Sequence, residues 1–227
     1  MKSKWFLLRE GENSPWYNMA FDEALLEAEI EYPLLRLYEW DRPSVTMGYT
    51  QKIEFAPVDQ YDVVRRPTGG GFVYHDSQYT YTVVLPKDHW VTELKPIESY
   101  NWINKGVMEA LKLIDFSSTM ADQEIPRHVD RNKMVCFKTP TRYDLLANDE
   151  KVAGSAQRRT KTGILHQGSI ETADFNIDEA ELVEALPKGF YTVFECEYLE
   201  FDNSGLQERT QELIETKYQT KEWNYRR

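Results

Sequence analysis

Apolar residues recur along this chain with two different periods, and each period predicts a different element. Between Pro96 and Ile114 they return every three or four positions, which is the spacing of a helix with one buried face. Pro96 suits the first turn of that helix. Short runs rich in aromatic and β-branched residues predict strands instead. We expect strands at 5–8, 34–39, 45–49, 62–66, 72–75, 79–85, 143–147, 151–157 and 164–170.

Local signals predict further helices and turns. Ser14 followed by Pro15 is typical of a helix start, with serine as the cap and proline in the first turn. Residues 148–150, Asn-Asp-Glu, tolerate the left-handed backbone of a tight hairpin turn. Residues 117–135 are polar and aperiodic, so we expect a long irregular loop there. The additional helices are expected at 14–29, 177–186 and 204–217.

The order of these elements indicates the fold class. Several predicted strands follow one another as neighbouring pairs, with helices between the pairs. This order favours an α+β fold with a mixed, largely antiparallel central sheet over a doubly wound parallel sheet. The sequence shows no repeats and no low-complexity linker, so we expect one domain over residues 1–227.

Composition and charge narrow the classes of function. The chain is 41% hydrophobic and 29% charged, as in water-soluble globular proteins. Its apolar runs are far shorter than the roughly 20 residues of a membrane helix, and we expect a cytoplasmic protein without a membrane partner. The net charge of -11 disfavours nonspecific nucleic-acid binding. Cys136 and Cys196 lack nearby paired histidines, so no metal site is predicted.

One glycine-rich segment joins two predicted strands. It reads Arg65-Arg66-Pro67-Thr68-Gly69-Gly70-Gly71, and the strand after it ends at His75. Three successive glycines cost backbone entropy but let main-chain N–H groups approach a bound molecule closely. The two arginines can form paired hydrogen bonds with a carboxylate or a phosphate. The spacing is not that of a Walker or Rossmann loop, and a glycine-rich hairpin with solvated arginines would explain the same residues.

Lys151 and Cys136 are the candidate reactive side chains. Lys151 opens a predicted strand in which Gly154, Ser155 and Ala156 leave room on one face. A cysteine becomes a nucleophile where a nearby cation favours its thiolate, and Lys151 can provide that cation if the fold brings the two together. Taken alone, Lys151 also fits a surface lysine, and Cys136 also fits a small buried residue.

Three segments, in this order, resemble one family. RRPTGGGFVYHD, KVAGSAQRR and ILHQGSI are similar to motifs of the lipoate–protein ligase and octanoyltransferase family, which is related to the biotin–protein ligases. NMAFDEALL and PSVTMGYTQ resemble the family's first helix and an early strand. The resemblance covers residues 5 to 190, and it implies the biotin/lipoate ligase catalytic-domain fold with a tunnel for an apolar acyl chain.

The resemblance also implies roles for individual residues. Cys136 and Lys151 are expected to be catalytic. The acyl or adenylate group is expected to contact Arg65, Thr68, Gly69, Gly70, Gly71, His75, Gly154, Ser155, Ala156 and His166.

Two chemistries remain open within the family. A ligase activates free lipoate with ATP and Mg²⁺ through an acyl-adenylate, and Arg65 and Lys151 would then hold carboxylate and phosphate oxygens. A transferase needs no cofactor. It takes octanoyl from acyl carrier protein through a thioester on Cys136, and passes it to a lysine of a lipoyl-domain protein.

The sequence carries features of both branches. Cys136-Phe137 resembles the cysteine-dependent, ligase-like octanoyltransferases, and the chain has no room for the C-terminal accessory domain of many ligases. Gly71 completes a triple glycine as in the ligases, whereas transferases of this branch more often carry arginine there. Because of the Cys-Phe pair and the chain length, we favour the transferase despite Gly71. A biotin ligase and a non-catalytic binding relative are the more distant alternatives.

Overall fold

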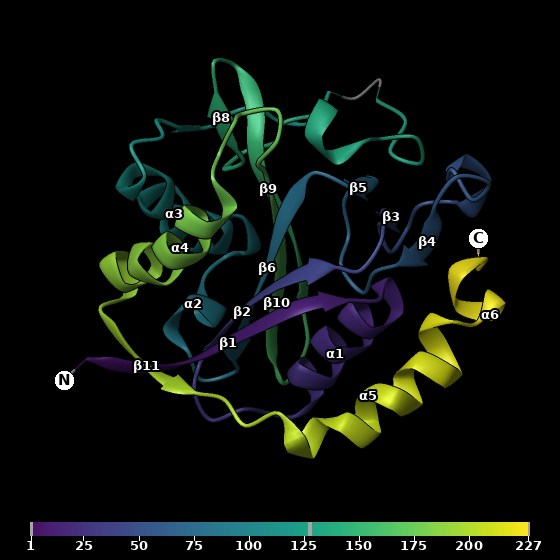
Figure 1. The fold of residues 1–227 in the computed structure, drawn as a ribbon, viewed down its shortest axis with the longest axis horizontal. Helices are drawn as coiled ribbons and strands as arrows, with labels where there is room; N and C mark the ends of the chain where they lie inside the picture. The colour runs from purple at the N-terminus through teal and green to yellow at the C-terminus, as the bar shows by residue number, and fades with distance from the viewer. Residues whose placement is uncertain (1, 127–128, 227) are drawn as a thin grey trace.

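A large mixed sheet forms the centre of the protein, in a computed structural model that describes residues 2–126 and 129–226 (Figure 1). Its strands are β1 (Ser3–Asn13), β2 (Leu34–Trp40), β6 (Gln78–Pro86), β7 (Thr119–Met120), β8 (Leu145–Ala147), β9 (Glu150–Arg159), β10 (Gly163–Glu171) and β11 (Cys196–Glu200). Their order across the sheet is β11-β1-β2-β6-β10-β9-β8-β7. The pairs β1–β11 and β1–β2 are parallel, and the other pairs are antiparallel. The predicted fold class is confirmed.

A second, smaller sheet lies beside the first (Figure 1). It contains β3 (Ser44–Met47), β4 (Asp62–Arg65) and β5 (Val73–His75), in the order β4-β3-β5. A single 3-10 turn, η1 (Ile53–Phe55), lies between β3 and β4 in the sequence. The glycine-rich segment connects β4 to β5, so it projects from the end of this small sheet.

Helices lie on both faces of the large sheet (Figure 1). The helices of the protein are α1 (Pro15–Glu27), α2 (Trp90–Glu93), α3 (Pro96–Leu113), α4 (Glu179–Phe194), α5 (Gln207–Leu213) and α6 (Lys221–Asn224), of which α6 packs on β4 of the small sheet. Helices α3 and α4 pack side by side on one face, while α1 lies on the other with α5 alongside it (Figure 1). Successive residues of β6 serve the two faces in turn: Val83 belongs to the α3–α4 core, and Val84 to the α1 core. Among the described residues, no helix is long and apolar enough to cross a membrane.

The predictions of helix starts and turns were accurate where adjacent residues determine the backbone conformation. The Ser14 side chain accepts a hydrogen bond from Tyr17 N at 3.2 Å, as expected of a helix cap. Asn148 and Asp149 have φ angles of 51° and 66°, as the predicted hairpin turn requires. The predicted helix 177–186 was too short, because α4 continues through Pro187 to Phe194.

Several short elements were not predicted, among them β7, β11, α2 and α6. Strand β11 is a short edge strand without an alternating pattern. Within the predicted loop 117–135, the structure contains the two-residue strand β7, and residues 127–128 lie outside the described part of the chain. The last predicted helix is divided into η3 (Ser204–Leu206), α5 and a π-helical turn, η4 (Ile214–Tyr218).

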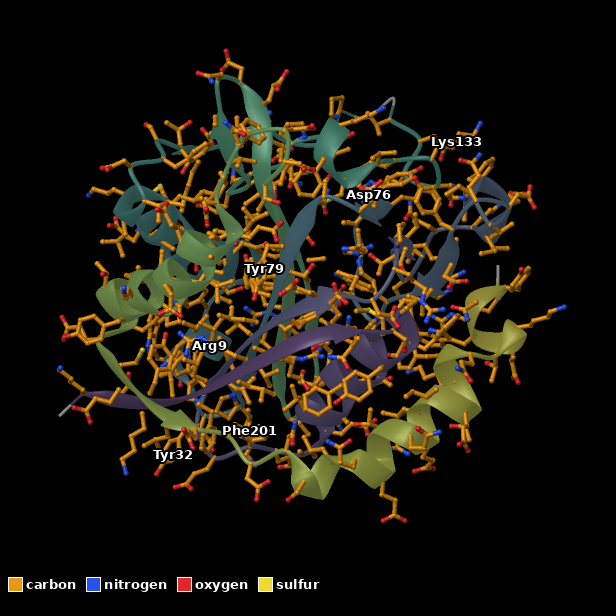
Figure 2. The ribbon with its side chains drawn as sticks, in the orientation of Figure 1. Arg9, Tyr32, Asp76, Tyr79, Lys133 and Phe201 are labelled. Atoms are coloured by element: carbon orange, nitrogen blue, oxygen red, sulfur yellow. The ribbon has the colours of Figure 1, made fainter. Side chains whose placement is uncertain are left out.

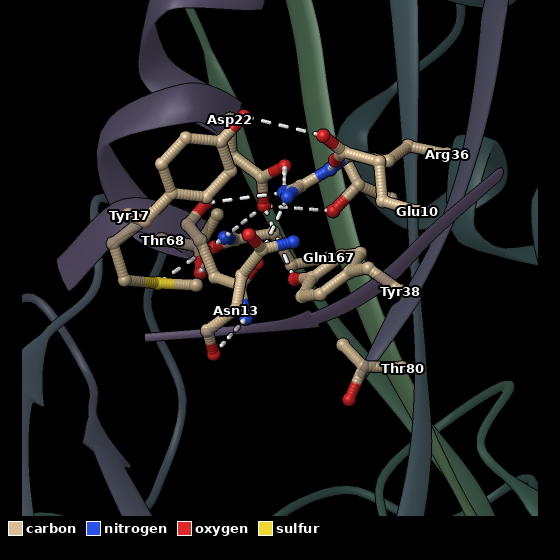
Figure 3. A network of polar contacts seen from close by, with 12 residues as sticks. Glu10, Asn13, Tyr17, Asp22, Arg36, Tyr38, Thr68, Thr80 and Gln167 are labelled. Atoms are coloured by element: carbon tan, nitrogen blue, oxygen red, sulfur yellow. Dashed lines mark hydrogen bonds and ion pairs between the residues drawn. The ribbon is translucent and has the colours of Figure 1, made fainter. Parts of the chain in front are cut away.

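A buried polar network connects helix α1, the sheet and the glycine-rich segment (Figure 3). The fully buried Arg36 guanidinium lies 2.7 Å from Asp22 Oδ1 and 2.6 Å from Glu10 Oε2. Gln167 donates a 2.7 Å hydrogen bond to the second oxygen of Asp22. The same amide accepts a 2.7 Å hydrogen bond from the Thr68 hydroxyl. Thr68, at the start of the glycine turn, is therefore anchored to an ion pair in the core.

Candidate active site

Cys136 and Lys151 lie in direct contact. Cys136 begins a 3-10 turn, η2 (Cys136–Lys138), and Lys151 is the second residue of β9. The Lys151 ammonium is 3.2 Å from Cys136 Sγ and 3.1 Å from the carbonyl oxygen of the same residue. The ammonium thus lies beside the atom that must carry negative charge if the cysteine acts as a nucleophile. The structure thus brings the two predicted reactive groups together.

Asp144 completes this group, and the sequence analysis did not identify it. Its carboxylate lies 2.7 Å from Lys151 Nζ, and both side chains are nearly inaccessible to solvent. Its Oδ2 also accepts hydrogen bonds from the backbone N–H and hydroxyl of Thr141. The preceding residue, Tyr143, has a left-handed backbone with φ of 72°, and Asn104 holds its carbonyl through a 2.8 Å hydrogen bond.

These neighbours keep Lys151 charged despite its burial. Burial alone lowers the pKa of Lys151, but the Cys136 thiolate and the Asp144 carboxylate outweigh it and raise the pKa above its usual value. Because the folded-state pKa is raised, the ammonium stabilises the fold at neutral pH, and this contribution is lost as the pH rises through the raised pKa. The lysine is therefore a proton donor held next to a sulfur.

Gly154 provides the space in which the Lys151 side chain lies. A Cβ atom at position 154 would approach Lys151 Cε and Nζ at 2.1 and 2.3 Å, well inside contact distance. The sequence analysis assigned the small residue to an acyl slot. Gly154 does line a cavity. The stronger reason for a glycine at this position is the Lys151 ammonium, which lies where a Cβ atom would be.

We expect Gly154→Ala to lower the catalytic rate by about 10²-fold, because a displacement of about 1 Å in a reactive group has an effect of that size. The measurement is the rate of the acyl transfer that the motif resemblance implies, together with the melting temperature. Gly205→Ala is the matched control, since a Cβ there meets nothing within 4 Å. An unchanged rate in Gly154→Ala would show that the lysine side chain can shift without consequence.

The glycine turn is paired with the backbone around Cys136. Phe72 N donates to Met134 O at 2.8 Å, and Cys136 N donates to Phe72 O at 2.8 Å. A Cβ at position 71 would lie 2.4 Å from Met134 O, so the third glycine permits this approach. Gly70 has φ of 87°, in the left-handed region that glycine enters freely. The structure therefore places the glycine turn next to the backbone that carries Cys136.

The two neighbouring arginines face different surroundings. Arg65 is hydrogen-bonded to the carbonyls of Gln51, Trp223 and Asn224, and it lines neither cavity described below. Arg66 is buried and donates to the carbonyls of Thr46, Gly69 and Gly71.

No carboxylate partner of Arg66 is found in the described part of the chain. Burial lowers the pKa of Arg66 to about 10, which leaves the guanidinium charged at neutral pH. A buried cation without a carboxylate can stabilise negative charge on a bound molecule. The family resemblance implied Arg65 for this role, whereas the geometry favours Arg66.

Two cavities meet at Cys136. The inner cavity is narrow, with a volume of about 30 Å³, and its wall includes Met19, Trp40, Arg66, His75 and Gln167. The outer cavity measures about 570 Å³, and its wall includes Gly69, Gly70, Tyr100, Arg131, Arg142 and Lys151. Cys136, Ser155 and Ala156 line both cavities. A molecule that entered from the outer cavity would therefore pass the thiol before reaching the inner one.

The other predicted contact residues divide into two groups. His75 lines the inner cavity, where its ring stacks on Trp40 with ring centres 3.8 Å apart. Thr68, Gly71 and His166 are not among the residues that line either cavity. Their assigned contacts with a bound molecule stay predictions. No group of three or more metal-binding side chains is found within residues 2–126 and 129–226.

His166 makes the fold sensitive to acid. It is fully buried, and burial lowers its pKa to about 3. Because the unfolded chain binds this proton near pH 6.5, the stabilisation is present above pH 6.5 and is lost as the pH falls toward 3. At pH 5 this histidine is protonated in the unfolded chain but not in the folded one. We expect this difference alone to lower the free energy of unfolding by about 2 kcal/mol relative to neutral pH.

Denaturant unfolding of the wild type and His166→Gln at pH 7 and pH 5 measures this contribution. The variant should lose about 2 kcal/mol less than the wild type between the two pH values. Equal losses would mean that His166 is protonated in the folded state or that other groups dominate the acid sensitivity.

Known proteins are similar to this chain over most of its length. Residues 14–194 match the family described as the lipoyl protein ligase A/B catalytic domain. The chain is 30% identical to octanoyltransferase LipM of Bacillus anthracis, over 100% of this chain and 99% of that protein. It is 36% identical to octanoyltransferase LipM of Staphylococcus aureus, over 79% of this chain and 69% of that protein.

Solved structures share the fold. A T. acidophilum protein with bound lipoic acid superposes with a TM-score of 0.81 at 24% identity, covering 100% of both chains. A lipoate-protein ligase A bound with ATP superposes with a TM-score of 0.77 at 23% identity, covering 99% of both chains. At this level of identity the likeness concerns the fold.

Proposed function

The chain belongs to the lipoyl protein ligase A/B catalytic-domain family, as its ordered motifs predicted, and from this we propose that it transfers an octanoyl group to a lipoyl-domain protein. The donor is octanoyl-acyl carrier protein, and the acceptor group is one lysine. The observation that carries the proposal is the 3.2 Å contact between Cys136 Sγ and Lys151 Nζ at the junction of the two cavities. We place the reaction in the cytoplasm, and the single catalytic domain over 1–227 stays a prediction.

The first half of the reaction loads the enzyme. The Cys136 thiolate attacks the carbonyl carbon of the donor thioester and forms a new C–S bond. The negative charge that develops on the carbonyl oxygen is stabilised by the cations on the cavity walls, Lys151 and Arg66. The intermediate then expels the donor's thiolate, which takes a proton from the Lys151 ammonium. The products are octanoyl-Cys136, a free carrier thiol and a neutral lysine.

The second half passes the acyl group on. The neutral amine of the acceptor lysine attacks the thioester, and Lys151 takes the proton that this nitrogen must lose. The C–S bond breaks, an amide forms, and the thiolate and ammonium are restored. Asp144 is 2.7 Å from the ammonium and holds it in place through both halves.

The inner cavity is the proposed site for the acyl chain. Burying about seven methylene or methyl groups contributes about 5 kcal/mol to binding. A cavity of about 30 Å³ is too small for the whole chain, so lining side chains must move. Met19 is unbranched and flexible, which makes it the wall residue best able to do so.

An ATP-dependent lipoate–protein ligase is the second candidate, supported by Gly71, which completes a triple glycine. Mg²⁺ in nucleotide sites takes one or two carboxylates together with phosphate oxygens. Among the described residues in the wall of the outer cavity, Glu124 is the acid present. Lys151, which would hold phosphate in a ligase, is already paired with Asp144. These residues fit ATP and Mg²⁺ poorly, and we derive no step through them.

One experiment separates the two candidates. The protein is incubated with octanoyl-acyl carrier protein and a lipoyl domain without ATP, and both the enzyme and the domain are weighed by intact-mass spectrometry. We expect one octanoyl group on the lipoyl domain and a transient octanoyl adduct on the enzyme. Modification only with free acid and ATP would establish the ligase. No modification under either condition would favour a non-catalytic relative.

A further inference from the structure

Gln51 connects the small sheet to the segment that carries the nucleophile. We call residues 129–136 the cysteine loop. The Gln51 side chain is 1% exposed, and its Oε1 accepts a 3.0 Å hydrogen bond from Gly48 N. Its Nε2 lies 3.2, 3.3 and 3.1 Å from the carbonyl oxygens of Arg131, Asn132 and Met134. One amide thus contacts three backbone carbonyls within four residues of a loop that is 80 or more residues away in sequence.

Among the described residues, other contacts also connect the cysteine loop to the rest of the protein, apart from those of Cys136 with Lys151. The backbone pairing through Phe72 is one of them. Another is the Lys133 ammonium, which lies 4.8 Å from the centre of the Phe55 ring. Lys133 itself is at the rim of the molecule (Figure 2). Gln51 differs from these because it is buried and meets carbonyls on both sides of Lys133. It therefore fixes the path of the backbone that leads into Cys136.

This path determines whether the thiol meets the ammonium. Lys151 is held independently by Asp144 on the hairpin of β8 and β9, so the sulfur is the partner that can move. The carbonyl of Met134 is shared by Gln51 Nε2 and Phe72 N, two residues before Cys136. Without the amide, buried carbonyl groups lose their donor, and unpaired buried carbonyls favour rearrangement of the loop.

We propose that Gln51 is a positioning residue for the nucleophile, which acts by donating hydrogen bonds to the cysteine loop and so keeps Cys136 Sγ beside the Lys151 ammonium. Its effect on acyl transfer rests on the proposed function. Its effect on the thiol does not, because the reactivity of Cys136 toward a small alkylating reagent needs neither acyl donor nor acceptor.

The test uses the full chain and two replacements, Gln51→Met and Gln51→Glu. Methionine has a similar length and no hydrogen bonds. Glutamate can still accept from Gly48 N but cannot donate to the loop. Gln60→Glu, at an exposed turn position, is the matched control. The readouts are the rate of Cys136 alkylation by iodoacetamide, located by peptide mapping, the values of kcat and KM for the lipoyl domain, and the melting temperature.

We expect both Gln51 variants to alkylate about tenfold more slowly than the wild type at pH 7.5, because the ammonium no longer lies beside the reacting sulfur. We also expect kcat to fall by about 10- to 100-fold with KM for the lipoyl domain little changed. The Gln60 variant should match the wild type. A lower melting temperature with unchanged alkylation and kcat would overturn the proposal, as would faster alkylation. If alkylation falls but no variant or wild type transfers octanoyl, the positioning role stands and the proposed function fails.

Discussion

Cys136→Ala should abolish octanoyl transfer, lowering its rate by at least about 10⁴-fold, because removal of a covalent nucleophile leaves only binding and electrostatic effects. The variant should also show no octanoyl adduct by intact-mass spectrometry. The substitution removes one sulfur atom from the junction of the two cavities and leaves the Lys151–Asp144 ion pair in place. We therefore expect little change in the melting temperature.

The matched control for this prediction is Cys196→Ala. Cys196 is the other cysteine of the chain, and it is buried in the edge strand β11, among the core residues below α4. Its replacement should leave the transfer rate and the adduct unchanged per folded molecule. If Cys136→Ala still modified the lipoyl domain at the wild-type rate, the acyl group would have to pass directly from donor to acceptor, and the thioester intermediate would be wrong.

The sequence predicted best those parts of the molecule that nearby residues determine. The pattern from Pro96 to Ile114 gave helix α3 within one residue of its end, because the apolar stripe and the first-turn proline act within the same segment. The hairpin between β8 and β9 also depends on two adjacent residues with positive φ. By contrast, α4 passes through Pro187, and only packing against α3 explains a helix that continues there.

The choice between Arg65 and Arg66 shows why the site was less predictable. Neighbouring residues at the end of a strand point to opposite sides, so one of the two arginines is expected to face the cavity and the other to face away from it. Which one does so depends on Trp223 and Asn224, whose carbonyls accept hydrogen bonds from Arg65 across about 160 residues of sequence. No local pattern carries that information.

Asp144 was harder to find from the sequence. In the structure Leu146 pairs with Lys151 and the register shifts between Leu145 and Leu146, so a regular hairpin around residues 148–150 does not show which residue of the first strand lies beside the lysine. An acid there is a natural partner for a buried lysine. Gln51 offered no local signal either, because a glutamine that hydrogen-bonds to a distant loop looks like any polar residue after a strand.

Lys151→Met should lower the transfer rate by about 10³-fold, within the usual range for removing a general acid–base group. Methionine fills a similar volume, so the loss reports the ammonium. That group contacts the sulfur at 3.2 Å and the carboxylate of Asp144 at 2.7 Å. Its removal takes the proton donor from the leaving thiolate and the base from the incoming amine. It also leaves a buried carboxylate without its cation, which costs about 3–5 kcal/mol of stability.

The double variant Lys151→Met with Asp144→Asn separates these two effects. It removes the unpaired charge, so it should recover most of the lost stability in denaturant unfolding. It should not recover the transfer rate, because the proton donor is still missing. Iodoacetamide should alkylate Cys136 more slowly in both variants than in the wild type, since neither has a cation beside the sulfur. Recovery of the rate together with the stability would mean that Lys151 supports the fold of the site and takes no part in the chemistry.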